Sequence, residues 1–244
     1  MFCVAPVRFA AENKDPKAQI IPSVSFLAGF QSIMLICFYD GPDPGKSFAM
    51  FPSDPKALTL DDWKKRPFAE FVTSIPSDMQ AGQRGTFHTV SLKEYTPSII
   101  QTIADQAVLI NKNAVAAGKS ATFLSYGIEP FSDYGHFANA HGPTMFPHEN
   151  SPLPTNIYFA WSDAKDDDYF KKAARDTAEF IAKQAEAQGQ DIKSLHLYPN
   201  YCQADTPATQ MYGSANAEKL RAAKLKYDPH NIMGKGTSYF SFSA

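Results

Sequence analysis

The fold is decided by the stretch from Ala18 to Tyr39, which runs AQIIPSVSFLAGFQSIMLICFY. Its two halves, at 18–26 and 30–39, are rich in β-branched and aromatic residues, as strands are. Only the three residues at 27–29 separate them, a connection that fits a hairpin and therefore an antiparallel pair. The sequence thus predicts against a purely parallel sheet.

Extended runs of the same composition recur at 86–93, 121–128, 156–161 and 195–201. Each is bounded by Gly, Pro, Asp or Ser, the residues that favour turns. The sequence therefore predicts six strands, distributed over most of its length.

Helical patterns alternate with these strands. Thr96 followed by Pro97 predicts a helix N-terminus, and isoleucine and alanine then recur at three- and four-residue spacing until Gly118. A second helix is predicted from the acidic run at 166–168 to Gly189, because acidic residues suit the positive end of a helix dipole.

Two further helices are predicted with less regular patterns. One covers about 215–226 and stops before Asp228-Pro229, since the residue before a proline disfavours helical geometry. The other, at about 60–72, is interrupted by Pro67.

These elements predict an α+β fold, in which an antiparallel β-sheet is covered mainly on one face by helices and a strand–helix segment ends the chain. We expect a sheet domain at 1–190 and a C-terminal segment at 191–244. The uncovered face of the sheet must then meet something else.

Composition excludes several classes of protein. The 244 residues carry a net charge of −2 with acids and bases interspersed, so no basic stripe is available for nucleic acid. The longest apolar stretch, at 32–39, is far shorter than the roughly 20 residues that cross a bilayer, which predicts no membrane partner. The N-terminus shows no secretory signal pattern, so the sequence leaves the compartment open.

Cysteine and histidine patterns predict no metal site. Cys3, Cys37 and Cys202 form no Cys-x-x-Cys pair, and Cys37 is expected to be a core residue. The long segment at 130–154 holds three histidines, which are expected to anchor the loop because their spacing matches no standard metal site. These are His136, His141 and His148. A Gly-x-Ser-x-Gly elbow for hydrolysis is also absent from the sequence.

Four motifs lie in order near the C-terminus. They are Tyr198-Pro-Asn200-Tyr201, Tyr212-Gly213, a helix with Leu220 and Lys224, and Asp228-Pro-His-Asn231. This order resembles the C-terminal signature of the berberine bridge enzyme-like FAD-linked oxidases: Tyr-x-Asn-Tyr, Tyr-Gly, Leu-x-x-Ile-Lys and Asp-Pro-x-Asn. Ala223 stands where that family usually has a larger aliphatic residue.

The resemblance extends upstream, where four stretches are similar to the fungal branch of the family. They are at 25–29, 37–42, 146–148 and 158–161, so the similarity covers about 13–233. The family's FAD-binding half is not represented, since the 13 glycines include no Gly-x-Gly-x-x-Gly and no glycine-rich attachment segment for the flavin. We therefore expect the chain alone to retain no FAD, and the flavin domain to be missing or separate.

The resemblance also implies roles for individual residues. It places Tyr198, Asn200 and Asn231 against the cofactor and makes Tyr201 the general base. Asn156 lies where plant relatives have a catalytic glutamate, so the base chemistry would fall on Tyr201. Substrate-facing residues on the sheet would be Tyr126, Asn156 and Tyr158.

A tyrosine base imposes a physical demand. The pKa of tyrosine is about 10, and a base that works near neutrality must have a pKa roughly 2 to 3 lower, which requires a nearby cation or hydrogen-bond donors. The sequence nominates no such cation. Taken as strand residues, Tyr198 and Asn200 would share one face, on which they could meet a planar heterocycle. The alternative is that these tyrosines only pack a sheet.

Two hypotheses about function remain open. The first is that the chain is the substrate-side half of an FAD-dependent oxidoreductase, which oxidises a hydroxylated sugar or secondary metabolite with O2 and is inactive by itself. The second is a non-enzymatic, truncated or split product that acts as a binding module, so the sequence leaves enzymatic activity undecided. In either case we expect exposed apolar surface, most clearly at 238–242.

Overall fold

The computed structural model describes residues 4–51, 64–74, 80–131, 144–148 and 153–236. Its centre is a five-stranded sheet in the order β2-β1-β4-β5-β3, and all neighbouring strands are antiparallel. The strands are β1 (Ala18–Leu27), β2 (Phe30–Tyr39), β3 (Arg84–Leu92), β4 (Ala121–Ile128) and β5 (Leu153–Trp161). The predicted α+β class and antiparallel sheet are confirmed.

The first two strands form the predicted hairpin. Leu27 pairs with Phe30, which leaves Ala28 and Gly29 as the central residues of a two-residue turn. Both have positive φ, at 47° and 85°, and a hairpin turn of the type I′ class needs this conformation at both positions. The backbone N–H of Ala28 donates to the carbonyl of Thr122, so the turn is also fixed to the start of β4.

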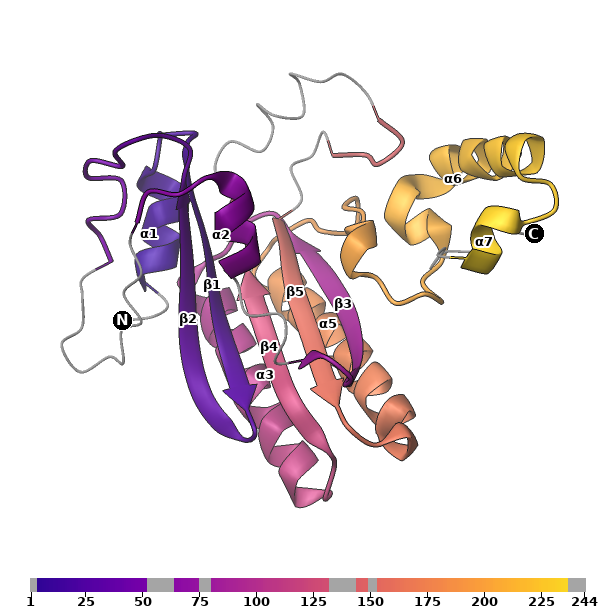
Figure 1. The fold of residues 1–244 in the computed structure, drawn as a ribbon, viewed down its shortest axis with the longest axis horizontal. Helices are drawn as coiled ribbons and strands as arrows, with labels where there is room; N and C mark the ends of the chain where they lie inside the picture. Colours follow the sequence, from indigo (N-terminus) through magenta and orange to yellow (C-terminus); the bar gives the residue numbers. More distant parts are fainter. Residues whose placement is uncertain (1–3, 52–63, 75–79, 132–143, 149–152, 237–244) are drawn as a thin grey trace.

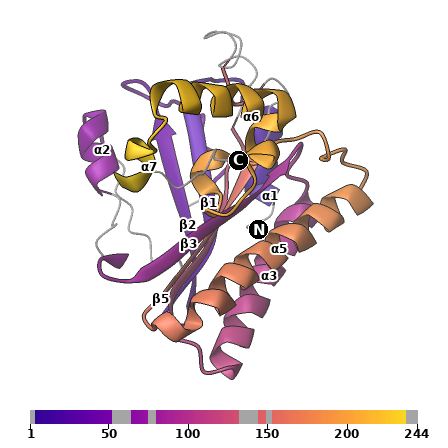
Figure 2. The ribbon, with the colours of Figure 1, turned by 90° about the vertical axis from the view of Figure 1, so that its right-hand side faces the viewer.

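Two long helices cover one face of the sheet. These are α3 (Pro97–Ala116) and α5 (Asp167–Ala187), which lie side by side in Figure 2. Isoleucines of α3 and the Phe170 side of α5 pack on the inward side chains of β4 and β5, and the buried cluster includes Leu124, Ile157 and Trp161. Burial of this alternating face stabilises both layers.

The two long helices begin and end near the predicted positions. The Thr96 hydroxyl accepts a hydrogen bond from the N–H of Ile99 at 3.1 Å, which caps α3, and Gly118 beyond its end has φ of 62°. Helix α5 starts within the acidic run and is followed by Gly189 with φ of 87°.

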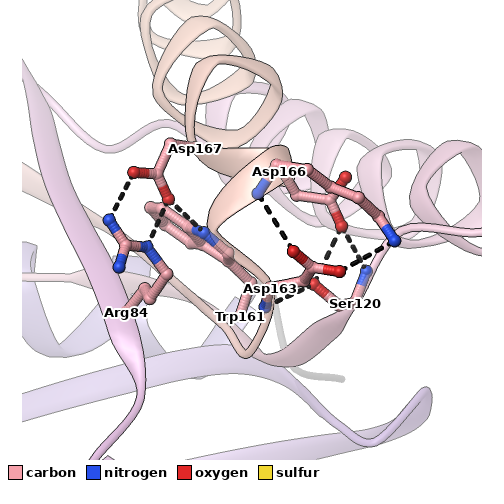
Figure 3. A network of polar contacts seen from close by, with 7 residues as sticks. Arg84, Ser120, Trp161, Asp163, Asp166 and Asp167 are labelled. Carbon is pink, nitrogen blue, oxygen red and sulfur yellow. Dashed lines mark hydrogen bonds and ion pairs between the residues drawn. The ribbon is translucent and has the colours of Figure 1, made fainter.

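The acidic run at the start of α5 anchors that helix to the sheet and to the end of α3 (Figure 3). Buried Asp166 accepts from the Lys119 ammonium at 2.9 Å and from the backbone and hydroxyl of Ser120. Asp167 accepts from the Arg84 guanidinium and from the Trp161 indole at 2.8 Å. Asp166 ends the short 3-10 helix η2 (Ala164–Asp166), and Asp167 begins α5. Both carboxylates are therefore paired with donors within the protein.

Shorter helices lie around this sandwich. Helix α1 (Val4–Glu12) packs Phe9 on Ala18 and Ile20 of β1, in a second cluster that partly buried Cys37 joins. Helix α2 (Phe68–Ser74) lies on the opposite face at the β2 side, where Phe68 meets Phe38 edge to face. The helix predicted at 60–72 thus begins only after Pro67, and residues 60–63 lie outside the described part of the chain.

The C-terminal part differs most from the prediction. Residues 195–201 form no strand; they run as an irregular segment into the 3-10 helix η3 (Pro199–Tyr201). The N–H of Leu197 donates to the carbonyl of Gln210, and Pro199 has no N–H to donate to a strand. The backbone N–H of Leu197 therefore bonds to the following helix and not to a neighbouring strand.

Helix α6 (Ala208–Tyr227) and the short α7 (Ile232–Gly236) lie beyond the β3 edge of the sheet (Figure 1). Helix α6 begins earlier than the predicted residue 215 because its first turns precede a break at Gly213, where φ is 73°. In the part of the chain that the structure describes, no helix has the length and apolarity needed to cross a membrane.

Candidate functional site

A cavity of about 140 Å³ lies where η3 meets the sheet. The three nearest strands contribute Ser91 from β3, Glu129 directly after β4, and Pro154 from β5. Phe131, Phe146, Tyr198 and Tyr201 complete its lining. The cavity therefore combines an apolar wall with one carboxyl group and two phenol hydroxyls.

The centre of the cavity is a hydrogen bond between residues far apart in sequence. The Tyr201 hydroxyl donates to Oε1 of Glu129 at 2.8 Å. Glu129 is only 3% exposed, so its carboxyl group is largely removed from water. A buried acid that meets a phenol in a cavity is a group that can exchange a proton with a bound molecule.

Tyr95 holds the backbone around Glu129. Its fully buried hydroxyl donates to the Pro154 carbonyl at 2.6 Å and accepts from the N–H of Glu129 at 3.3 Å. It also lies 3.0 Å from the hydroxyl of Thr155. One phenol thus ties the end of β4 to the start of β5, which fixes the carboxyl group at the cavity.

Burial sets the pKa values of both partners. It raises the pKa of Glu129 to about 7, although the hydrogen bond from Tyr201 favours the carboxylate. Burial and the neighbouring Glu129 carboxylate raise the pKa of Tyr201 above the ordinary value, and only the contact with Asn156 lowers it. Tyr201 is therefore a neutral donor in this chain, and this direction is opposite to the one that a tyrosine base requires.

The turn η3 brings its aromatic side chains together. Tyr198 and Tyr201 contact each other edge to face, with ring centroids 5.0 Å apart, because residues three apart lie on the same side of a 3-10 helix. The exposed Asn200 donates from Nδ2 to the Tyr198 hydroxyl at 2.7 Å. The predicted proximity of Tyr198 and Asn200 thus arises from a turn, and the strand argument for it was wrong.

Gly213 explains the Tyr-Gly motif. Besides its positive φ, a Cβ atom at this position would lie 3.1 Å from Cε1 of the His196 ring. The carbonyl of His196 in turn accepts from the Ser91 hydroxyl at 2.7 Å. A glycine there lets the segment before η3 lie close to both α6 and β3.

The sheet residues predicted to face a substrate separate into two groups. Asn156 and Tyr158 lie on the face opposite α3 and α5, where the Tyr158 ring lies 4.4 Å from that of Phe87 and Asn156 contacts Tyr201. Tyr126 lies on the other face, fully buried in the cluster beneath the helices. Its placement does not fit contact with a substrate bound on the face of Asn156 and Tyr158, because side chains on the two faces of a sheet point in opposite directions.

Asn231 also lies apart from the cavity residues. It occupies the turn between α6 and α7 with φ of 53°, and its N–H donates to the Asp228 carbonyl at 3.0 Å. Asparagine tolerates this left-handed conformation better than most residues. Its geometry is that of a turn residue, and its predicted contact with a cofactor stays a prediction.

Glu129 and Tyr95 were not among the residues that the sequence suggested. The available signal was a carboxyl group directly after an apolar strand, followed by a proline, in Ile128-Glu129-Pro130. That pattern is common at strand ends. Only the contact with Tyr201 of η3 distinguishes Glu129 from an ordinary turn residue.

Within the described ranges, no group of three or more His, Cys, Asp and Glu side chains could hold a metal ion. His148 lies with Nδ1 2.7 Å from the carbonyl of Phe146 and 3.2 Å from the hydroxyl of Thr144, which agrees with a loop-anchoring role. His136 and His141 lie outside the described residues.

Comparison with known proteins gives a match to one family model and to several solved structures. Residues 197–234 match the family model described as berberine and berberine like. No curated protein matches the sequence significantly.

Solved structures match nearly the whole chain. 6-Hydroxy-D-nicotine oxidase from Arthrobacter nicotinovorans has a TM-score of 0.66 at 14% identity, over 94% of this chain and 49% of its own. A berberine bridge enzyme variant in complex with (S)-reticuline has a TM-score of 0.60 at 15% identity, over 94% and 50%. Glycopeptide hexose oxidase complexed with teicoplanin has a TM-score of 0.57 at 13% identity, over 94% and 49%.

The chain therefore spans about half the length of the solved structures that it matches. At these identities the similarity establishes the fold. The chain shares its fold with one half of the berberine bridge enzyme-like oxidases and carries, at residues 197–234, the segment described by that family's model.

Proposed function

We propose that this chain is the substrate-side half of an FAD-dependent oxidoreductase that oxidises a hydroxylated small molecule, a sugar or a secondary metabolite, with O2 as the acceptor. The face of the sheet opposite α3 and α5, together with η3, lies over an isoalloxazine ring that another domain holds. Bound FAD would accept hydride from the substrate carbon and pass the electrons to O2. The chain supplies substrate positioning and proton removal, and is inactive by itself.

One observation carries the proposal. The family segment at 197–234 places Tyr198 and Tyr201 at a cavity, on a fold shared with oxidases over 94% of the chain. A planar heterocycle beside η3 would meet the exposed Asn200 amide and the Tyr198 phenol, which both offer hydrogen bonds. The substrate hydroxyl would lie at Tyr201 and its carbon skeleton against Phe131 and Phe146.

The described residues fit the ring of FAD better than its phosphates. The positive-φ glycines stand singly, at 29, 45, 82, 118 and 189 and at the break within α6 at 213, and none forms a glycine-rich loop at the start of a long helix. An aromatic and amide surface without a pyrophosphate cradle suits a cofactor anchored elsewhere. The chain should thus contact the isoalloxazine and leave the nucleotide to the other domain.

A flavin titration of the purified chain tests this division. Binding to the chain should change the fluorescence of free FAD and of lumiflavin, which is the ring without the nucleotide. The two affinities should be weak and similar, and neither flavin should stay bound through gel filtration. The double variant Tyr198→Ala/Asn200→Ala should bind at least about five-fold more weakly, since it loses a stacking ring and an amide. The control Tyr227→Ala alters an exposed α6 residue and should bind as the unmodified chain does.

Two results would contradict the proposal. FAD that binds far more tightly than lumiflavin and remains bound would show a complete dinucleotide site in this chain. A titration in which the fluorescence of neither flavin changes up to millimolar concentration would show that the chain does not contact the isoalloxazine ring.

Oxidase activity is tested in the whole protein encoded by the full transcript, or in the complex with its flavin-holding partner. Hydrogen peroxide release is measured with a panel of sugars and hydroxylated secondary metabolites. Release by the flavin-loaded protein and none by the chain alone is expected. If the transcript encodes no flavin domain and no flavoprotein binds the chain, the non-enzymatic binding module is the better description.

A further inference from the structure

Residues 201–203 wrap around the β3 edge of the sheet. The Tyr201 ring stacks on Phe87, with ring centroids 6.0 Å apart, and Phe87 pairs with Tyr158 on the face opposite α3 and α5. Two residues later, Gln203 contacts α5, which covers the other face. Since β3 is an edge strand, the chain passes from the cavity to the helix layer between these two side chains.

Gln203 is held on α5 through both ends of its amide. Its Oε1 accepts a hydrogen bond from the Arg175 guanidinium, and its Nε2 donates to the Lys171 carbonyl at 2.9 Å. The side chain is only 6% exposed, so water does not readily replace either bond. A buried side chain that uses both its donor and its acceptor fixes the backbone that carries it.

A second side chain of the same loop binds the same arginine but lies in water. Asp205 forms an ion pair with Arg175 at 3.2 Å, and the Asp205 side chain is 73% exposed. Exposed ion pairs contribute little, because water and salt screen them. Gln203 is therefore the contact that decides where the loop lies, and Asp205 offers a matched control.

The buried histidine beneath Arg175 does not compete for the guanidinium. His88 lies on the α5 side of β3, and its Nδ1 has no hydrogen-bond partner among the described residues. Burial, with a smaller contribution from the Arg175 charge, lowers the pKa of His88 to about 4, so the imidazole is neutral at neutral pH. The guanidinium is thus used by the loop that follows η3 and not by the sheet.

We propose that Gln203 is a positioning residue of the substrate site: its amide, held by α5, fixes η3 so that the rings of Tyr198 and Tyr201 line the cavity. The inference rests on the proposed function, for which this cavity is the substrate site, and deepens it by naming the residue that holds the site in shape. Gln203 acts through η3, since it is not among the residues that line the cavity.

Three variants separate the buried amide from the exposed ion pair. Gln203→Leu removes both hydrogen bonds and leaves Arg175 with Asp205. Gln203→Glu keeps an acceptor for Arg175 but presents an oxygen to the Lys171 carbonyl, and the two oxygens repel. Asp205→Asn removes the ion pair and leaves both bonds of Gln203 in place.

Fluorine NMR of the chain labelled with 3-fluorotyrosine tests the inference directly. The resonances of Tyr201 and of the fully buried Tyr126 are assigned by their loss from the respective Tyr→Phe variants. In Gln203→Leu the Tyr201 resonance should broaden or shift towards that of the exposed Tyr227, while the Tyr126 resonance stays in place. Gln203→Glu should give a smaller change of the same kind, and Asp205→Asn none.

An unchanged Tyr201 resonance in Gln203→Leu overturns the inference, because other contacts would then position η3. Where Gln203→Leu also disturbs Tyr126, Gln203→Glu decides. Tyr201 must change alone in that variant, and any other pattern shows that Gln203 supports the whole fold and not the site.

The flavin-loaded whole protein gives the kinetic arm. Gln203→Leu should lower the limiting rate of flavin reduction by substrate at least about ten-fold, because a displaced η3 misaligns the substrate, and Asp205→Asn should keep the rate. A Gln203→Leu protein that loses stability but keeps the limiting rate defeats the inference. An unmodified protein that reduces no flavin defeats the proposed function, whereas the fluorine spectrum of the chain still decides what holds η3.

Discussion

At the scale of single residues, Glu129 presents a conflict between stability and chemistry. The folded protein raises the pKa of this carboxyl group from an ordinary value near 4 to about 7, so folding favours the protonated form. Stability from this group is complete at pH below about 4 and is lost as pH rises through 7. A group retained at such a cost is typical of a functional site.

Glu129→Gln is therefore expected to stabilise the chain at pH 8. The amide replaces a buried carboxylate, and a pKa difference of this size corresponds to about 3 to 4 kcal/mol. The difference should shrink towards zero at pH 4, where glutamate is protonated in both states. Urea unfolding at both pH values measures it, and a variant that is less stable than the unmodified chain at pH 8 would contradict the prediction.

Tyr126 and Tyr198 show what single-residue chemistry leaves undecided. Both are tyrosines in apolar surroundings, yet one lies in the core beneath α5 and the other at the cavity. Their residue type and neighbours in sequence do not distinguish them. The face of the strand or turn on which each lies decides its role.

At the scale of elements, the junction between β5 and α5 depends on one carboxylate. The contacts with Lys119 and Ser120 hold the pKa of Asp166 at about 2, well below its usual value. A lowered pKa means that this stabilisation is present above the unfolded value near 4 and is lost as pH falls through 2. The end of α3 and the start of α5 are thus joined most firmly at neutral pH.

We expect Asp166→Asn to lower the urea midpoint at pH 7 and to approach the unmodified chain as pH falls from 4 to 2. The amide cannot form the ion pair with Lys119, and one of its two ends no longer accepts hydrogen bonds. Asp191→Asn, an exposed change near Lys93, serves as the control and should have little effect. A gap between Asp166→Asn and the unmodified chain that stays constant with pH would assign the effect to shape and not to charge.

The hairpin of β1 and β2 contains a strained residue. Ala28 adopts positive φ, which costs an L-residue roughly 1 kcal/mol, and Asn-Gly is the preferred pair for such a turn. Ala28→Asn is expected to raise stability by up to about 1 kcal/mol. Gly29→Ala should lower it, although a Cβ atom there would meet nothing within 4 Å. Thermal unfolding of the pair should show opposite signs, and equal signs would refute the conformational explanation.

At the scale of the whole molecule, the sheet is open at its β2 edge. Phe30 is 81% exposed and Ile33 is 56% exposed, and Met34 and Leu35 are also exposed. An exposed edge strand with apolar side chains is a site for self-association. The expected apolar surface is therefore present on β2, whereas the segment 238–242 lies outside the described residues.

The purified chain should consequently self-associate as its concentration rises. Ile33→Lys places a charge on the edge strand and should shift the sedimentation profile towards the monomer without lowering the melting temperature by more than a few degrees. Lys17→Ile, a loss of charge before β1, is not expected to restore the monomer. A monodisperse monomer of the unmodified chain at high concentration would contradict this prediction.

Much of the fold was accessible from local sequence. Five of the six predicted strands and the two long helices were found within about three residues of their bounds, because alternation, caps and turn glycines act over short distances. The predicted strand at 195–201 failed because strand composition does not reveal the partner of each backbone N–H. There, Leu197 pairs with α6 and Pro199 begins a turn.

The sequence by itself determined the antiparallel hairpin, the two long helices α3 and α5, and the ordered motifs between Tyr198 and Asn231, since each depends on neighbours along the chain. Only the tertiary structure decided that Tyr201 meets Glu129, 72 residues away, that Tyr126 faces the core, and that a cavity forms where η3 meets the ends of the strands. The physical reason is that hydrogen bonding and burial across the sheet depend on strand order and on where η3 packs, and local residue patterns carry neither.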